Sequence, residues 1–275
     1  LLGRNILEGG SLLFLDEVQA TPHVLAALRY FYEELPELPV IAAGSLLEFA
    51  LAKHSFSMPV GRVEYHHISP VSFSEFITCL EPDLNAWREA AGRFEEIPET
   101  AHQRLLSRFR EYLFVGGMPE AVLEFMESGS LSEVQEVQRS IVETYQDDFS
   151  KYAQHTELVR LQRIFGQIPR NIGRKIKYVN LSREERSREI KAGVELLSRA
   201  QVCQKVTVSH CSGLPLSAEA SDDHYKLIFM DVGIVNYLCG GRWNDISEAT
   251  GQVLVNEGPL AEQFVGQHLA YLDRG

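Results

Sequence analysis

The sequence predicts an α/β unit with a partial parallel sheet, followed by a helical region and a winged-helix domain. Three observations predict this order. Short apolar runs alternate with a helix-like segment near the start, amphipathic helices follow, and an Arg-rich helix then precedes two strand-like runs. The chain of 275 residues is long enough for two domains or three small ones. We expect four parts, at residues 1–80, 81–155, 156–245 and 246–275.

The α/β unit is predicted from two apolar runs, Leu12–Leu15 and Val40–Ala43, which we expect to be strands. A helix expected over Pro22–Leu35 separates them, and the turn residues Gly44 and Ser45 follow the second run. Continuous apolar runs separated by a helix are typical of parallel strands that are buried on both faces. These residues therefore predict part of an open α/β sheet.

Residues 81–155 are expected to form a helical lid or connector, and the stretch "SEVQEVQRSIVETYQDDFSKYA" has its clearest pattern. Ser132 and Gln135 at the start of this stretch have the spacing of a capping box. Before it, "GGMPEAV" predicts a turn at Gly116 and Gly117 and a helix with Pro119 in its first turn. The apolar residues of the long helix recur every three or four positions: Val134, Val137, Ile141, Tyr145, Phe149 and Tyr152.

Residues 156–245 have the order of a winged-helix domain, in which helices precede a β-hairpin. Two runs, Val202–Val208 and Leu227–Met230, predict the strands of the hairpin. Asp231 stands at the following strand-to-helix junction, where we expect it to cap a helix. The last part is expected to begin with a helix near Pro259 that the end of the chain interrupts. An apolar stripe marks the Arg-rich helix before the hairpin: Ile190, Val194, Leu196 and Leu197.

The charge of the chain is unevenly distributed. The formal net charge is -12, yet residues 160–191 contain ten basic and three acidic residues. A positive segment of this kind could bind DNA phosphates. A winged helix can also dock onto a protein, and arginines on a helix face are commonly only solvated. These three interpretations stay open.

Other side chains exclude several classes of protein. The four cysteines have no CxxC spacing, which favours a reduced, cytoplasmic setting. No stretch of about 18 apolar residues free of charge occurs, so we expect no membrane span. Neither His66 and His67 nor the group of His210, Cys211 and His224 has metal-ligand spacing, so we expect no metal other than Mg²⁺. The chain begins without Met or a signal pattern, and we expect its first residue to be a fragment boundary.

The segment "LLFLDEVQ" at residues 12–19 carries the chemistry. Four apolar residues that lead into Asp16 and Glu17 have the form of a Walker B motif. In this motif the Asp holds Mg²⁺ and the Glu orients the water that attacks the γ-phosphate. A bound cation would also offset the desolvation of two adjacent carboxylates. The alternative is a strand that ends in a solvated acidic turn.

Two further residues are candidates for contacts with phosphate. "VIAAGS" ends in Ser45, a small polar residue where P-loop ATPases place a sensor for the γ-phosphate; the alternative is a plain Gly–Ser turn. Arg62 in "PVGRVEYHHISPVSF" could reach phosphate in its own subunit or in a neighbouring one. A solvated loop arginine is the alternative for Arg62.

Six segments in order resemble a known family: "LLFLDEVQ", "VIAAGSLLEF", "VGRVEYHHISPVSFSEF", "GGMPEAV", "DVGIVNYL" and "EGPLAEQFVGQHL". They resemble the prokaryotic AAA-type P-loop ATPases in which the core is followed by a winged-helix segment and a restriction-endonuclease-like C-terminal domain of unknown function. The resemblance implies ATP and Mg²⁺ as cofactors and a P-loop NTPase core over residues 1–80. It further implies Asp16 as the Mg²⁺ ligand, Glu17 as the catalytic acid, Ser45 as the sensor and Arg62 as a phosphate-sensing arginine.

Two departures from the family pattern limit what the resemblance implies. No GxxxxGK[ST] motif occurs, and the resemblance expects that loop upstream of Leu1, so this chain alone is expected to bind ATP weakly or not at all. The nuclease-like domain would begin near Glu257–Leu269, and its catalytic residues would lie beyond Gly275.

The expected function follows from these features. The chain is expected to be part of an ATP-hydrolysing protein that couples nucleotide state to its winged-helix and C-terminal domains. Self-association is a further expectation, because AAA-type cores commonly donate an arginine across an interface. The alternative is a DNA- or protein-binding winged-helix module with a remnant, non-hydrolysing ATPase core.

Overall fold

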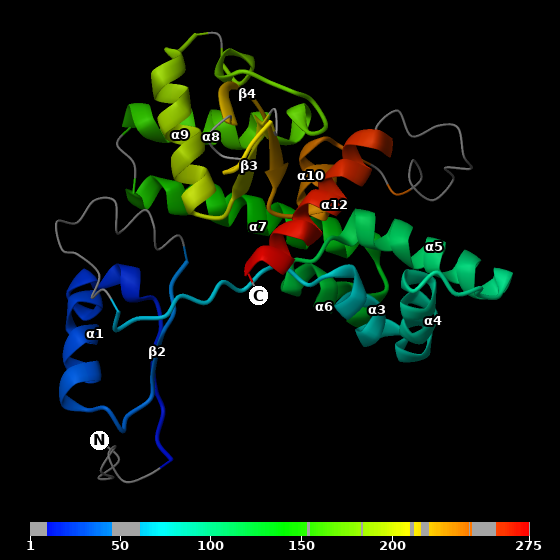
Figure 1. Cartoon of the computed structure of the whole chain (residues 1–275), viewed down its shortest axis with the longest axis horizontal. Helices are drawn as coiled ribbons and strands as arrows, with labels where there is room; N and C mark the ends of the chain where they lie inside the picture. Colours follow the sequence, from blue (N-terminus) through cyan, green and yellow to red (C-terminus); the bar gives the residue numbers. More distant parts are fainter. Residues whose placement is uncertain are drawn as a thin grey trace. The chain divides into compact units, whose positions relative to one another are not determined.

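A computed structural model describes residues 10–45, 61–152, 155–182, 184–209, 212–215, 220–241, 243 and 257–274. The chain divides into two compact units. The first unit contains residues 1–67 and Arg199–Gln201, and the second contains residues 68–198 and 202–275. Figure 1 draws residues 10–45 of the first unit in blue. Each unit is described by itself below.

The first unit contains the predicted pair of parallel strands. β1 (Leu13–Leu15) pairs with β2 (Val40–Ala42), and Leu13 lies opposite Val40. The short η1 (Val18–Ala20) and the helix α1 (Pro22–Glu34) connect them, and α1 runs beside the strands in Figure 1. Both strands and the helix are one residue shorter than expected. The core of this unit contains Val18, Leu25 and Leu28, with neighbours Leu15, Val24, Phe31, Val40, Ala42 and Val63.

The expected burial of both faces of the strands is wrong for the described residues. Leu15 and Val40 pack on the core, but Phe14 and Ile41 point to the other face and are 56% and 48% exposed. Side chains alternate between the two faces of a strand, so a single helix can cover only one of them. The described sheet has one covered face and one open face.

The second unit consists mainly of helices (Figure 1). The long helix α7 packs against α6, α8 and α10, and α5 packs against α10. The helices are α3 (Phe73–Leu80), α4 (Pro82–Gly92), α5 (Glu99–Val115), α6 (Pro119–Ser128), α7 (Leu131–Tyr152), α8 (His155–Gln167), α9 (Ser187–Arg199), α10 (Val232–Leu238) and α12 (Glu257–Arg274), with the short η2 (Pro169–Asn171) and η3 (Tyr178–Asn180).

The caps of these helices correct one expectation and confirm two. α7 begins at Leu131, and the Ser130 hydroxyl accepts the Glu133 N–H at 3.3 Å, so Ser132 lies inside the helix and does not cap it. Pro119 is the first residue of α6, as expected. Asp231 caps α10 as expected, because its side chain accepts the N–H of the third residue of that helix.

The start of the second unit is held by the turn between α5 and α6. Val71 donates its N–H to the Gly117 carbonyl at 2.7 Å, and the Tyr112 hydroxyl donates to the Val71 carbonyl at 2.7 Å. Phe73 then donates its N–H to His268 Nε2 at 2.9 Å. The His268 ring accepts this bond in its neutral form, and burial lowers its pKa. The segment is therefore fixed by its main chain.

Buried amides complete the core of the second unit. The Gln138 side chain donates to the carbonyls of Phe114 and Val115 at 2.8 and 3.1 Å, at the last turn of α5. Gln263 on α12 accepts the Phe229 N–H at 2.8 Å and donates to the Phe229 carbonyl at 2.7 Å. These side chains satisfy main-chain groups that would otherwise be buried without partners.

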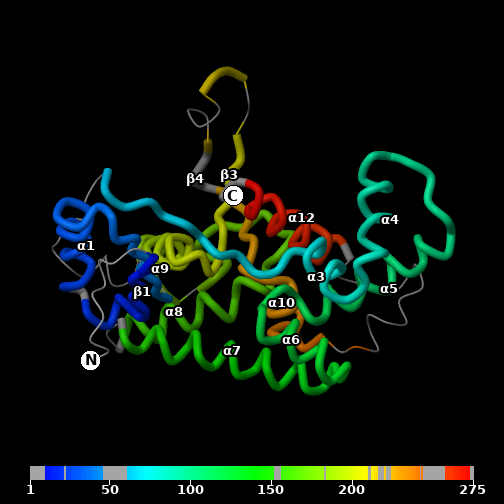
Figure 2. The backbone as a smooth tube through the Cα atoms, turned by 90° about the horizontal axis from the view of Figure 1, so that it is seen from below, coloured from blue at the N-terminus to red at the C-terminus, as the bar shows by residue number. Residues whose placement is uncertain are grey.

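The remaining elements of the second unit are a hairpin and the helices before it. β3 (Cys203–Ser209) pairs with β4 (Ala220–Phe229) in antiparallel register, with a bulge between Thr207 and Val208. Ile176, between α8 and α9, adds a single bridge to Tyr225 on β4. The hairpin projects from the helices in Figure 2. On α9 three of the four predicted apolar residues, Ile190, Val194 and Leu197, are fully buried, and Leu196 is partly buried.

Candidate functional site

The predicted acidic pair lies at the carboxyl end of β1. Asp16 and Glu17 are both exposed, and the Glu17 N–H donates to Asp16 Oδ1 at 3.0 Å. Glu17 has φ 52° and ψ 40°, a left-handed conformation that costs energy for a residue with a side chain. The chain turns sharply at Glu17 and enters η1.

Ser45 follows the carboxyl end of the neighbouring strand. Ala43 donates its N–H to the Leu15 carbonyl at 2.8 Å, and Val18 donates to the Ala43 carbonyl at 3.1 Å. These bonds hold the two strand ends together. Because the strands are parallel, Asp16, Glu17 and Ser45 lie at the same edge, where open α/β sheets bind ligands.

Gln19 joins Glu17 to Ser45, and sequence reasoning missed it. Its Nε2 donates to Glu17 Oε2 at 2.7 Å and to Ser45 Oγ at 3.4 Å. Gln19 is only 7% exposed, although it follows the acidic pair in a polar stretch. The only signal in the sequence was the position of Gln19, two residues after Glu17. Composition and periodicity do not distinguish such a glutamine from an ordinary turn residue.

Arg62 lies in a turn outside α1, and its side chain contacts Glu33 of α1. Its Nε donates to Glu33 Oε1 at 2.7 Å, and Arg29 donates to the same carboxylate at 3.0 Å. Hydrogen bonds, from Arg29 first and then Arg62, lower the pKa of Glu33. The structure therefore joins Glu17 and Ser45 through Gln19, with Asp16 next to Glu17 in the chain, and holds Arg62 on a different carboxylate.

The oxygen atoms at the strand ends fit a magnesium ion. Mg²⁺ is commonly held by one or two carboxylates, with water and substrate phosphate completing its shell. In the described residues no basic side chain pairs with Asp16 or Glu17, so their charges are not compensated by the protein there. A cluster of three or more His, Cys, Asp or Glu side chains that could hold a metal ion is absent from those residues.

The described residues of the first unit supply little positive charge for phosphate. Within residues 10–45, 61–67 and 199–201 the basic side chains other than histidine are Arg29, Arg62 and Arg199, and the first two contact Glu33. The Lys of a phosphate-binding loop would have to come from elsewhere. This agrees with the lack of a GxxxxGK[ST] motif in the sequence.

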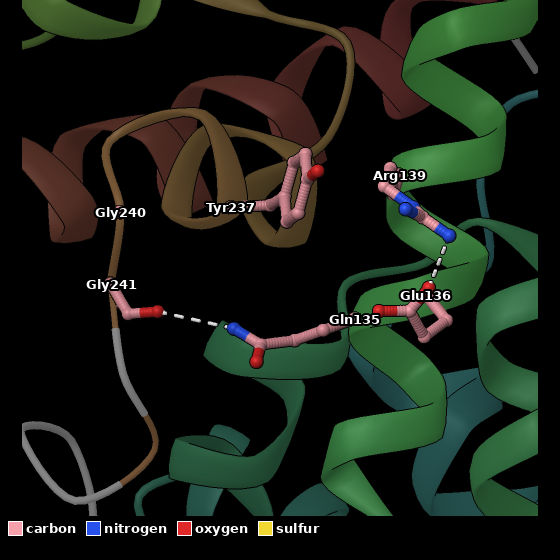
Figure 3. Close-up of a pocket in the computed structure, with 6 residues that line it drawn as sticks. All are labelled: Gln135, Glu136, Arg139, Tyr237, Gly240 and Gly241. Atoms are coloured by element: carbon pink, nitrogen blue, oxygen red, sulfur yellow. Dashed lines mark hydrogen bonds and ion pairs between the residues drawn. The ribbon is translucent and has the colours of Figure 1, made fainter.

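The second unit has a shallow pocket of about 300 Å³ that contains none of the predicted site residues (Figure 3). Gln135 donates to the Gly241 carbonyl at 3.3 Å across it, and Arg139 pairs with Glu136 at 2.5 Å. The side chains of Arg139 and Glu136 are 57% and 66% exposed, so solvent screens their charges. Tyr237 and Gly240 complete the lining.

The basic segment is partly neutralised by its own acids. Arg160 pairs with Glu185 and Glu189, and Arg163 pairs with Glu184 and Glu185. Lys191 is also near a carboxylate, that of Glu195, and Arg183 lies outside the described residues. Six cations of the described segment are exposed and form no ion pair: Arg170, Arg174, Lys175, Lys177, Arg186 and Arg188.

The remaining metal and thiol candidates gain no support. His66 and His67 are exposed, and His210 and Cys211 lie outside the described residues. Burial raises the pKa of the Cys203 thiol to about 12, which makes this cysteine an unreactive part of the core. Among the helices that the structure describes, none combines the length and apolar character that a membrane crossing requires.

The comparisons with known proteins identify two regions. The family model described as AAA domain matches residues 1–77, so the N-terminal region is similar to AAA-type P-loop ATPases. Neither the comparison with curated proteins nor that with solved structures gave a match. A second family model matches residues 106–245, which is half of the chain. The chain therefore belongs to the family described as Domain of unknown function (DUF8612).

Proposed function

We propose that the chain is part of an ATP-binding and ATP-hydrolysing AAA-type protein whose nucleotide state acts on its second unit. The observation that carries the proposal is the arrangement at the strand ends, where Asp16 and Glu17 meet Ser45 beside the parallel strands. The match of residues 1–77 to the AAA domain supports the same class of protein, an AAA-type ATPase. Site roles are assigned to four side chains: Asp16, Glu17, Ser45 and Arg62.

In the proposed reaction, the two adjacent carboxylates and the Ser45 hydroxyl have separate tasks. Asp16 would hold Mg²⁺, which supplies positive charge to the phosphate oxygens. Glu17 would orient the attacking water and accept its proton. Ser45 would donate its hydroxyl to a γ-phosphate oxygen. These tasks are compatible with one edge of the sheet because all three residues follow the carboxyl ends of the paired parallel strands.

Arg62 has a conditional role in this proposal. In the structure its guanidinium is engaged by Glu33, and the side chain is 39% exposed. An exposed ion pair contributes little to stability, so this one can open at low cost. Arg62 would leave Glu33 when it senses phosphate in its own subunit or in a neighbouring one.

The start of the second unit offers a route for coupling. Residues 68–72 lead directly into α3, and both main-chain groups of Val71 are hydrogen-bonded to the α5–α6 region. Gly117 leaves no space there, since an added Cβ would lie 2.1 Å from the Val71 carbonyl oxygen. A displacement of residues 68–72 would therefore move the end of α5.

Turnover of Mg·ATP tests the proposed function in the chain extended upstream through the expected phosphate-binding loop. We expect Glu17→Gln to lower the turnover rate by about 100-fold while binding is retained. Asp16→Ala should weaken binding itself. Glu37→Gln, an exposed carboxylate in the turn before β2, is the matched control and should behave as wild type. Equal turnover in Glu17→Gln and wild type would overturn the proposal.

A second candidate function is DNA binding through a winged-helix arrangement in the second unit. The observations that favour it are the order α8, Ile176, α9, β3 and β4, and the six exposed cations of the basic segment. Such cations would bind phosphates without reading the base sequence. In this interpretation the strand-end acids would be a remnant.

The salt dependence of binding to a short DNA duplex tests the second candidate. Replacing Arg174, Lys175 and Lys177 together by Ala should weaken binding and reduce the slope of log K against log salt by about 3. Arg139→Ala, an exposed cation outside this segment, is the control. An unchanged slope in the triple variant would exclude these cations from the interface.

A further inference from the structure

The side-chain amide of Gln19 occupies an unusual position between two site residues. One nitrogen, Nε2, donates to Glu17 Oε2 at 2.7 Å and to Ser45 Oγ at 3.4 Å. Gln19 is 7% exposed, whereas both partners are exposed. The buried amide thus connects two exposed side chains.

The main chain around Gln19 holds the amide in place. Val18 donates its N–H to the Ala43 carbonyl at 3.1 Å, which fixes η1 against the end of β2. Gly44 then passes so close to the amide that an added Cβ would lie 2.1 Å from Gln19 Oε1. A side chain at position 44 would therefore displace the amide from its present place.

Packing alone does not account for a glutamine here. Gln19 Oε1 is buried and has no hydrogen-bond partner in the described residues, a state that disfavours an amide relative to an apolar side chain of similar size. The two hydrogen bonds that Nε2 donates are the interactions that offset the cost of the unpartnered oxygen. They go to the two residues that the proposed function assigns to water and to phosphate.

We infer that Gln19 is a positioning residue for hydrolysis, an inference that rests on the proposed function. Its amide occupies Glu17 Oε2, which leaves Glu17 Oε1 to accept the proton of the attacking water. Because Ser45 Oγ accepts from Gln19, the Ser45 hydroxyl proton is directed to another acceptor, and a phosphate oxygen is suited to it. One buried donor therefore sets the roles of both exposed groups.

Replacement by a side chain of similar length tests the role in catalysis. In the extended chain, Gln19→Met should lower kcat about tenfold and leave the Kd for Mg·ATP and the melting temperature near wild type. Gln103→Met, at an exposed glutamine on α5, is the control. Wild-type kcat in Gln19→Met would overturn the inference, and so would a loss of kcat accompanied by equal losses in affinity and melting temperature.

A pH profile separates hydrogen-bond donation from shape. The carboxyl introduced by Gln19→Glu has one donor when it is protonated and none when it is ionised. We expect this variant to recover activity relative to wild type as the pH falls. A profile parallel to that of wild type would contradict a role for the donor.

An experiment without nucleotide uses the present chain. The side-chain amide resonances of Gln19 in a ¹H–¹⁵N spectrum should shift in Glu17→Ala and again in Ser45→Ala, and stay in place in Glu37→Ala. Unchanged resonances in both site variants would overturn the inference whether or not the protein hydrolyses ATP. Absence of turnover in the extended wild type would instead remove the proposed function, and the inference with it.

Discussion

Asp231 gives the prediction whose size follows most directly from the structure. Its side chain is fully buried, accepts the Gly117 N–H at 2.6 Å and accepts the Ile234 N–H at 3.0 Å. Burial raises the pKa of this carboxyl from 3.8 to about 6, and the main-chain N–H groups offset part of that rise. Replacing Asp231 by Asn removes the titration.

The sign and size of the pH effect on stability follow from the linkage between proton binding and folding. Because the folded state raises the pKa, the contribution of Asp231 to stability is complete below about pH 3.8 and is lost as the pH rises through about 6. The whole effect is about 3 kcal/mol, and about 1 kcal/mol of it falls between pH 5 and pH 7. Wild type should therefore lose about 1 kcal/mol relative to Asp231→Asn over this interval.

Denaturant unfolding at pH 5, 6 and 7 measures this difference. His268 titrates in both proteins, so its contribution cancels. Asp83→Asn, at an exposed Asp in the first turn of α4, is the control and should follow wild type at each pH. A difference between wild type and Asp231→Asn that stays constant or changes in the opposite direction would show that the main-chain N–H groups outweigh burial.

Two further variants test the packing of the second unit. Gly117→Ala should lower the free energy of unfolding by more than about 2 kcal/mol, because its Cβ would lie 2.1 Å from the Val71 carbonyl oxygen; Gly92→Ala, with open space around it, should stay within about 1 kcal/mol of wild type. Gln263→Met should cost about 2–4 kcal/mol because it leaves the N–H and C=O of Phe229 without their partner. Denaturant unfolding at fixed pH checks both, and wild-type stability in either Gly117→Ala or Gln263→Met would contradict the described packing.

The sequence predicted those elements whose cause is local. Apolar runs gave the positions of β1 and β2 to within one residue, and Asp231, two residues after the end of β4, capped the next helix as expected. The N-cap of α7 was predicted at Ser132, but the helix is capped by Ser130. Both serines stand three residues before a polar residue, Glu133 or Gln135, which is the spacing of a capping box. Local pattern alone does not distinguish two such serines.

Features that depend on distant parts of the chain could not be predicted. Gln19 is buried because η1 turns back against β2, and its bond to Ser45 joins residues 26 positions apart. The ion pairs within the basic segment also join distant positions, since Arg160 pairs with Glu185 and Glu189, 25 and 29 positions away. The exposure of Phe14 likewise depends on how many helices cover the strands.

Calorimetry of Mg·ATP binding tests the central claim most directly. It compares the present chain with the chain extended upstream through the expected phosphate-binding loop, the latter with and without Asp16→Ala. The account predicts Mg²⁺-dependent binding by the extended chain, with affinity at least about tenfold weaker in Asp16→Ala. No binding by either chain, or equal affinity with and without Asp16, would contradict a nucleotide site at the strand ends and leave the exposed cations of the second unit as the place of function.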